Sequence, residues 1–130
     1  MYKPCVLLDT CALLWLATGS DKLSDKALNV IEAASIVYVS AITAWEISLK
    51  TARGNLTLPI KPSQWFATAL EQHKLTLASL DVDILLAANE LPWLHRDPAD
   101  RFIIATALKL NATIVTTDKL IEQYDIAVIH

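Results

Sequence analysis

Two aspartates stand directly after short apolar runs, at positions where a carboxylate can do chemistry. Asp9 follows Val-Leu-Leu at 6–8, and Asp118 follows Ile-Val-Thr-Thr at 114–117. Open α/β sheets bind their ligands beyond the C-terminal ends of parallel strands, so both side chains are expected at one edge of one sheet. Each aspartate is also well placed to cap the helix that follows it. For either residue taken alone, both interpretations stay open.

Two further acids are expected on the apolar faces of helices. Asp100 precedes apolar residues at spacings of three, four and seven, and Glu46 has Ile42 four residues before it and Leu49 three residues after it. Helical geometry places residues at these spacings on one face. There are structural alternatives: Asp100 can stabilise a helix N-terminus by its charge, and Glu46 can pair with Lys50.

The four acids together predict a metal-dependent hydrolase. If Asp9, Glu46, Asp100 and Asp118 converge, their negative charges repel one another unless a cation compensates them. Oxygen donors with no histidine or thiolate nearby favour a hard metal ion, so the expected ion is Mg²⁺, with Mn²⁺ as the alternative. Such a site can activate water and stabilise charge on a phosphoryl group, which makes phosphodiester hydrolysis the expected reaction.

The elements that must position these acids form an α/β pattern. Short runs rich in valine, isoleucine and leucine alternate with longer segments of helical period, which is typical of a buried parallel sheet between helices. The sequence predicts strands at 5–8, 36–40, 113–117 and 126–129, with a weaker candidate at 75–80. We therefore expect an α/β fold with a central, mostly parallel sheet of four or five strands flanked by helices.

Helix starts are indicated by capping residues. Ser24 is expected to cap a helix that runs to about residue 34, and Ser40 one that ends at Arg53, with Gly54 in the stop position. Ser63 and Asp81 are expected to begin helices that end near residues 73 and 90. The clearest start is Asp97-Pro98, a cap followed by proline at the first helical position, and this helix should run to about residue 110.

Composition excludes several classes of protein. A chain of 130 residues with 54% hydrophobic and 19% charged residues fits one well-packed domain over 1–130. Its two glycines, Gly19 and Gly54, cannot supply a dinucleotide fingerprint, a Walker-type phosphate loop or a GxSxG nucleophile elbow. Two cysteines and three scattered histidines give no zinc-site spacing.

The apolar N-terminus does not predict a membrane segment. Asp9 lies in the middle of this stretch, where a charge costs about 2.5 to 3.5 kcal/mol on membrane insertion. No run of about 18 apolar residues occurs anywhere in the chain. We therefore expect a cytoplasmic protein with reduced thiols and no membrane partner.

Four segments resemble the PIN-domain ribonucleases, and more narrowly the VapC-type toxins of bacterial toxin–antitoxin pairs. They are LLDT at 7–10, SAITAWEISLK at 40–50, HRDPADRFIIATAL at 95–108 and IVTTD at 114–118, and they span nearly the whole chain in the order of the family. The third segment is the most specific. The resemblance implies a Mg²⁺-dependent endoribonuclease, a homodimer, and inhibition by a small antitoxin whose tail lies across the active-site groove.

The resemblance also implies roles for individual residues. The acidic quartet would be Asp9, Glu46, Asp100 and Asp118, with Asp9 and Asp100 as direct metal ligands and the other two binding directly or through water. Asp97 would be a nearby fifth acid. Thr10 and Thr117 resemble the polar residues that support this site, although both also suit ordinary helix starts.

The net charge of −3 does not contradict an RNA substrate, because we expect much of the acidity to lie in the site itself. Without the quartet, ten acidic residues face eleven basic ones. Lys50 and Arg53 follow Glu46 at spacings of four and seven, and Arg96 and Arg101 flank the two acids that open the last long helix. These four cations are candidates for phosphate contacts, or for helix salt pairs. His95 is either a loop packing residue or a substrate contact.

Other classes of function fit parts of the pattern. A phosphoacceptor receiver domain shares the size and the aspartates at strand ends, although adjacent acids at the end of its first strand are missing here. A haloacid-dehalogenase phosphatase would need an aspartate where Cys11 stands. A PIN-like module that binds RNA or protein without turnover is a third possibility. The apolar residues around Trp15, Trp45 and Trp65 predict a dimer or antitoxin interface.

Overall fold

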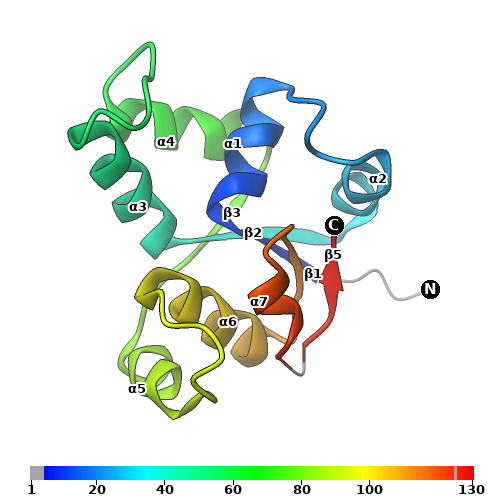
Figure 1. The fold of residues 1–130 in the computed structure, drawn as a ribbon. Coiled ribbons are helices and arrows are strands. Elements are labelled where there is room, and N and C mark those ends of the chain that lie inside the picture. The colour runs from blue at the N-terminus through cyan, green and yellow to red at the C-terminus, as the bar shows by residue number, and fades with distance from the viewer. Residues whose placement is uncertain (1–4, 125) are drawn as a thin grey trace.

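A five-stranded parallel sheet forms the centre of the molecule (Figure 1). The computed structural model describes residues 5–124 and 126–130. In spatial order the strands are β3-β2-β1-β4-β5, and every neighbouring pair is parallel. Their bounds are β1 Cys5–Leu8, β2 Ile36–Ser40, β3 Thr76–Ala78, β4 Thr113–Val115 and β5 Val128–Ile129. The fold is thus the α/β architecture expected from the alternating pattern.

Helices cover both faces of this sheet (Figure 1). The described residues contain α1 Thr10–Thr18, α2 Asp25–Ala33, α3 Ala41–Ala52, α4 Pro62–Gln72, α5 Val82–Glu90, α6 Pro98–Leu110 and α7 Lys119–Glu122. Helices α1 to α4 lie on one side of the sheet, and α5 to α7 lie on the other. Among the described residues, none of these helices has the length and apolar character needed to cross a bilayer.

Alternating side chains along β1 divide the core in two. Val6 and Leu8 pack with the helices on the α1 side, whereas Leu7 between them packs against α6 and α7. Successive side chains of a strand point to opposite faces, so a strand covered on both faces must be apolar at every position. This explains why β1 reads as an uninterrupted apolar run in the sequence.

The strand order reverses between β1 and β4. From β1 the chain builds β2 and β3 on one side, and it then crosses to build β4 and β5 on the other. Ligand sites of open α/β sheets lie at such a switch point. The same order contradicts the receiver alternative, whose flavodoxin-like sheet runs 2-1-3-4-5. β1 and β4 flank this point: Asp9 directly follows β1, and Asp118 lies three residues after the end of β4.

Most predicted caps are present, and one is wrong. The side chains of Ser24, Ser40, Asp81 and Asp97 each accept a backbone N–H at the start of a helix. Ser63 does not cap α4, because this helix begins one residue earlier, at Pro62. Proline suits the first helical position because its ring fixes φ and it lacks the N–H that would be unpaired there.

Three strands are shorter than the sequence predicts. β3 spans Thr76–Ala78, where the weaker candidate spanned 75–80. β4 ends at Val115 rather than at residue 117, and β5 begins at Val128 rather than at residue 126. The backbone N–H of Thr116 still donates to the carbonyl of Ile129 at 2.9 Å, but its hydroxyl donates to Asp9 and accepts the backbone N–H of Asp118, and the regular strand stops before it. Side chain to backbone bonds of this kind compete with the strand ladder. Because β4 ends early, Thr116 lies beside Asp9 at the C-terminal edge of the sheet.

The tryptophans of the expected interface have different environments. Trp65 is buried in the core beneath α4, so it is not available to a partner. Trp45 on α3 is 56% exposed, and Trp15 is half-buried. Of the three, Trp45 presents the largest unpaired apolar surface. Burial of Trp65 removes this residue from the apolar surface that the sequence predicts at an interface, and leaves Trp45 and Trp15 as its tryptophans.

Candidate functional site

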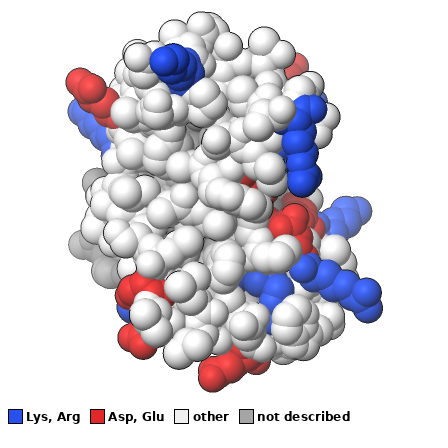
Figure 2. Space-filling model, turned by 90° about the vertical axis from the view of Figure 1, so that its left-hand side faces the viewer, with Lys and Arg blue, Asp and Glu red and all other residues white. Residues whose placement is uncertain are grey.

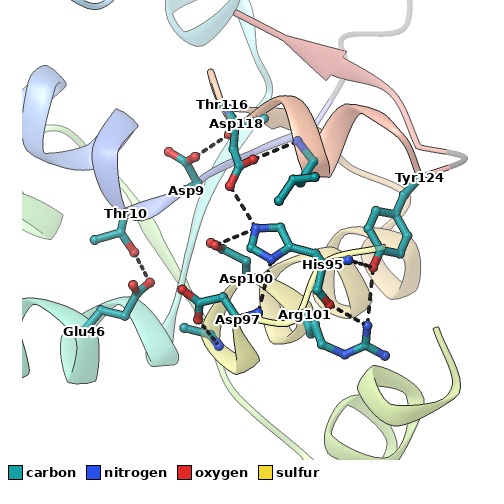
Figure 3. Close-up of polar contacts among 12 residues, drawn as sticks. Asp9, Thr10, Glu46, His95, Asp97, Asp100, Arg101, Thr116, Asp118 and Tyr124 are labelled. Atoms are coloured by element: carbon teal, nitrogen blue, oxygen red, sulfur yellow. Dashed lines mark hydrogen bonds and ion pairs between the residues drawn. The ribbon is translucent and has the colours of Figure 1, made fainter. Parts of the chain in front are cut away.

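Four acids, two within helices and two directly before helices, meet at the C-terminal edge of the sheet (Figure 3). Asp9 precedes α1, Glu46 lies in the middle of α3, Asp100 is in the first turn of α6, and Asp118 precedes α7. Figure 3 shows their carboxylates around one common space. Charge repulsion from Glu46 and Asp118 contributes to the raised pKa values of both Asp9 and Asp100, so the four groups form one electrostatic unit.

Asp9 both caps a helix and faces the site. Its Oδ1 accepts the N–H of Ala12 at 2.8 Å, and its Oδ2 accepts the hydroxyl of Thr116. Burial is the main cause of its raised pKa, which these hydrogen bonds partly offset. The capping and functional interpretations of this aspartate are therefore compatible, since a carboxylate has two oxygens and about four acceptor positions.

Two threonines hold carboxylates of the quartet in place. The Thr10 hydroxyl donates to Glu46 Oε1 at 2.5 Å, which connects α1 to α3. On the other side, Thr116 contacts Asp9, while the predicted Thr117 is exposed and makes no hydrogen bond to the quartet. The expectation for Thr117 is thus wrong by one position. Neighbouring residues of an extended segment point in opposite directions, so only one of the two can face Asp9.

A histidine lies among the acids, contrary to the expected all-oxygen surroundings. His95 is 7% exposed, and its Nε2 is 3.0 Å from Asp100 Oδ2 and 2.9 Å from Asp118 Oδ2. His95, Asp100 and Asp118 each offer one ligand atom, and these atoms lie within 4.8 Å of one another. The three residues are therefore close enough to hold a metal ion together. The sequence offered one signal for this residue, its position two residues before the Asp97-Pro98 helix start.

Asp100 has the most perturbed carboxylate of the site. Its pKa is raised to about 7, mainly by burial and then by the negative charges of Asp97 and Glu46, while the neighbouring His95 lowers it. Asp97 itself is exposed and caps α6 by accepting the N–H of Ala99 at 3.0 Å. Clustered carboxylates with raised pKa values are the electrostatic environment that a divalent cation relieves. The donor set therefore fits a divalent metal ion.

The raised pKa of Asp100 predicts how stability changes with pH in the absence of metal. The pKa is 3.8 for an ordinary aspartate and about 7 in the fold, so the folded state binds the proton more tightly between these values. Stability contributed by this group is then full below about pH 4 and is lost as pH rises to about 7. Thermal melts in EDTA should show the Asp100→Asn variant gaining stability over the parent across this window. A constant difference between the two proteins would contradict the assignment.

Arg101 does not border the site, which corrects its expected role as a phosphate contact. It is 2% exposed, and its guanidinium donates to the carbonyls of Ala88 and Leu91 at 2.6 and 2.9 Å. Further bonds reach the carbonyls of Pro92 and His95 and the hydroxyl of Tyr124. These carbonyls lie at and after the C-terminus of α5, where a cation is stabilised by the helix dipole.

The other three predicted cations line a groove beside the acids. It has a volume of about 590 Å³ and lies between α3 and the segment 96–99, with Glu46 and Asp97 in its wall. Lys50, Arg53 and Arg96 contribute to the same wall, and within the described residues none of them forms an ion pair. Figure 2 shows Lys and Arg side chains on either side of an acidic patch on this part of the surface.

Comparison with known proteins connects the site to one family. Residues 6–127 match the PIN domain family. The chain is 30% identical over 120 residues to Ribonuclease VapC22 of Mycobacterium tuberculosis. The aligned region covers 92% of this chain and 91% of that protein.

Solved structures with the same fold include two from other bacteria. VapBC2 from Rickettsia felis, bound to a DNA fragment from its promoter, matches with a TM-score of 0.69 and 16% identity over 96% of this chain and 97% of that chain. FitAcB from Neisseria gonorrhoeae matches with a TM-score of 0.64 and 24% identity over 96% of both chains. At these identities the likeness concerns the fold.

Proposed function

The chain belongs to the PIN domain family, and on this premise we propose that it is a metal-dependent endoribonuclease acting as the toxin of a toxin–antitoxin pair. The observation that carries the proposal is the convergence of four carboxylates at the switch point of the sheet, where burial and mutual repulsion raise the pKa of Asp100 to about 7. Such a cluster is costly to keep charged without a cation. The ribonuclease name of the relative from M. tuberculosis supports the same activity.

The quartet would hold Mg²⁺, or Mn²⁺ in its place. Asp9 and Asp100 are the proposed direct ligands because they are the two whose pKa values are raised, and a cation would relieve both. Glu46 and Asp118 complete the set directly or through water. The bound ion supplies charge compensation at the phosphoryl group and a lower pKa for the attacking water.

The protein's own residues orient the reactants. Glu46 is fixed by its hydrogen bond from Thr10, and Asp118 by its contacts with His95 and with the N–H of Leu120 at 2.8 Å. Either free carboxylate edge can accept a hydrogen bond from the attacking water and direct its lone pair toward phosphorus. Acceptors that are already fixed need no reorganisation during the reaction. This preorganisation is the main contribution to rate enhancement in such sites.

The groove beside the quartet fits an RNA strand. Lys50 and Arg53 lie four and seven residues after Glu46 on α3, which places them about 6 and 10.5 Å further along the helix axis. Together with Arg96 they can contact the phosphates next to the scissile bond. Trp45 in the same wall offers an aromatic face of the kind that RNA-binding grooves use.

We propose two protein partners, a small antitoxin and a second copy of this chain. A structural neighbour from Klebsiella pneumoniae, which is a toxin–antitoxin complex, supports the first. A shallow groove between α3 and α4 adds a suitable surface, because it is lined by Trp45, Pro62 and Phe66. A toxin of this type acts where its RNA target and its antitoxin are made, so we propose the cytoplasm as its location.

Metal removal tests the proposed activity. Protein treated with EDTA should fail to cleave RNA, and added Mg²⁺ or Mn²⁺ should restore cleavage, because the carboxylates alone cannot compensate the charge of the phosphoryl group. End-labelled RNA resolved on a denaturing gel measures the internal cuts. Unchanged cleavage in EDTA would contradict a metal mechanism. A folded, metal-binding protein that cleaves no RNA would instead be the non-catalytic binding module.

A further inference from the structure

His95 lies where three segments of the site meet (Figure 3). It belongs to the loop before α6, and its Nε2 lies within 3.0 Å of one carboxylate on α6 and of another before α7. The two contacted atoms are Oδ2 of Asp100 and Oδ2 of Asp118. At this position the imidazole could be either a nitrogen ligand of the metal or a hydrogen-bond donor to the two carboxylates.

The second ring nitrogen distinguishes these two roles. The backbone N–H of Asp97 donates to His95 Nδ1 at 3.2 Å, so Nδ1 acts as the acceptor and carries no proton. The proton of a neutral imidazole is then on Nε2, which makes Nε2 a donor. Histidines that bind metals show the reverse arrangement, because their second nitrogen donates an N–H to an acceptor and the ligating nitrogen keeps its lone pair.

We infer that His95 is a positioning residue that sets the spacing of two acids in the site, an inference that rests on the proposed nuclease function. Its Nε2–H bridges Oδ2 of Asp100 and Oδ2 of Asp118 and thereby fixes α6 relative to the β4–α7 junction. Oδ1 of Asp100 accepts no hydrogen bond from the described residues, so it stays free for the cation.

The backbone of His95 is held by the same two elements. Its N–H donates to the hydroxyl of Tyr124 at 2.9 Å, and its carbonyl accepts Nη1 of Arg101 at 3.0 Å. Tyr124 follows α7, and Arg101 is the neighbour of Asp100 on α6. The imidazole is therefore anchored from both sides before any metal binds. A preorganised support of this kind is what keeps ligands within the narrow geometry that catalysis needs.

Replacement of His95 by leucine and by glutamine tests the inference. Leucine has no donor, whereas glutamine carries an amide nitrogen that can reach the position of Nε2. We expect His95→Leu to lower Mn²⁺ affinity and kcat by about 10 to 100-fold, with KM for RNA nearly unchanged, and His95→Gln to recover most of both losses. Mn²⁺ affinity is measured by titration without RNA. The control is His73→Leu, because His73 lies before the N-terminal end of β3, whereas the quartet lies at the C-terminal edge of the sheet.

Each outcome separates the inference from the proposed function. If His95→Leu binds Mn²⁺ and cleaves RNA like the parent, the positioning role is wrong while the nuclease stands. If glutamine is as impaired as leucine and the Mn²⁺ spectrum of the parent shows coupling to a histidine nitrogen, His95 is a ligand and the inference is overturned. If the parent binds no metal, both the proposed function and the inference fail.

The tautomer can be tested in the parent protein, which covers the case in which a variant fails to fold. Long-range ¹H–¹⁵N NMR correlations distinguish a protonated Nε2 from a protonated Nδ1. We expect the proton of His95 on Nε2 both without metal and with saturating Mg²⁺, since the donor role is the same in both states. A proton on Nδ1 in the Mg²⁺-loaded protein would overturn the inference.

Discussion

Replacing Asp100 with asparagine is expected to lower RNA cleavage by a factor on the order of 10³ and to leave a protein that folds at least as stably as the parent. The amide keeps the shape of the carboxylate but removes the charge that would bind the cation. Without metal, the same change also removes a carboxylate whose charged form is destabilised by burial and by Asp97 and Glu46. Activity and stability should therefore change in opposite directions, which a general folding defect cannot produce.

Two measurements and a matched control make this prediction decisive. Gel assays with end-labelled RNA give the rate, and thermal melts in EDTA give the stability. Asp83→Asn, an exposed acid in the first turn of α5, should change neither. In bacteria, induced expression of the parent should stop growth, whereas Asp100→Asn should not. Cleavage by Asp100→Asn at the parent rate would remove this residue from the site, and equal growth arrest by both proteins would contradict toxicity through RNA cleavage.

Replacing Arg101 with methionine is expected to destabilise the fold by about 3 kcal/mol or more. The guanidinium is the hydrogen-bond donor for the carbonyls of Ala88, Leu91 and His95, and methionine would remove the side-chain donor from all three. The guanidinium of Arg101 also stacks on Trp93, with its Cζ 3.5 Å from the centroid of the indole ring. Urea unfolding measures the loss as a shift of the midpoint.

Arg96 provides the control for this substitution, because it has the same side chain only five positions earlier. It is exposed and lines the groove, so Arg96→Met should change the free energy of unfolding by no more than about 0.5 kcal/mol. A stability loss at Arg96 equal to that at Arg101 would contradict the structural assignment of the two residues. So would an Arg101→Met variant that unfolds at the same urea concentration as the parent.

Features that depend on neighbours in the chain were predictable from the sequence. The first two strands have the predicted bounds, and the caps at Ser24 and Asp97 are present, because apolar period and capping chemistry act over a few residues. The four acids were selected as candidates in the same way, from their positions after strands and on helix faces, and their role in the site stays a prediction. Even the error at Arg101 was avoidable, since adjacent helical residues do not share a face and Asp100 was assigned to the site.

Contacts between distant segments were decided by the tertiary structure alone. The strand order places Asp9 beside the β4 segment, 107 residues from its partner Thr116, and no local pattern distinguished Thr116 from Thr117. His95 reaches Asp118 across 23 residues, and the direction of its ring is set by the Asp97 N–H and by the groups that hold its backbone. The sequence thus determined which residue types could form a metal site. Packing of the two helical layers against the sheet determined which of their atoms meet, because side-chain direction depends on contacts that only the completed fold provides.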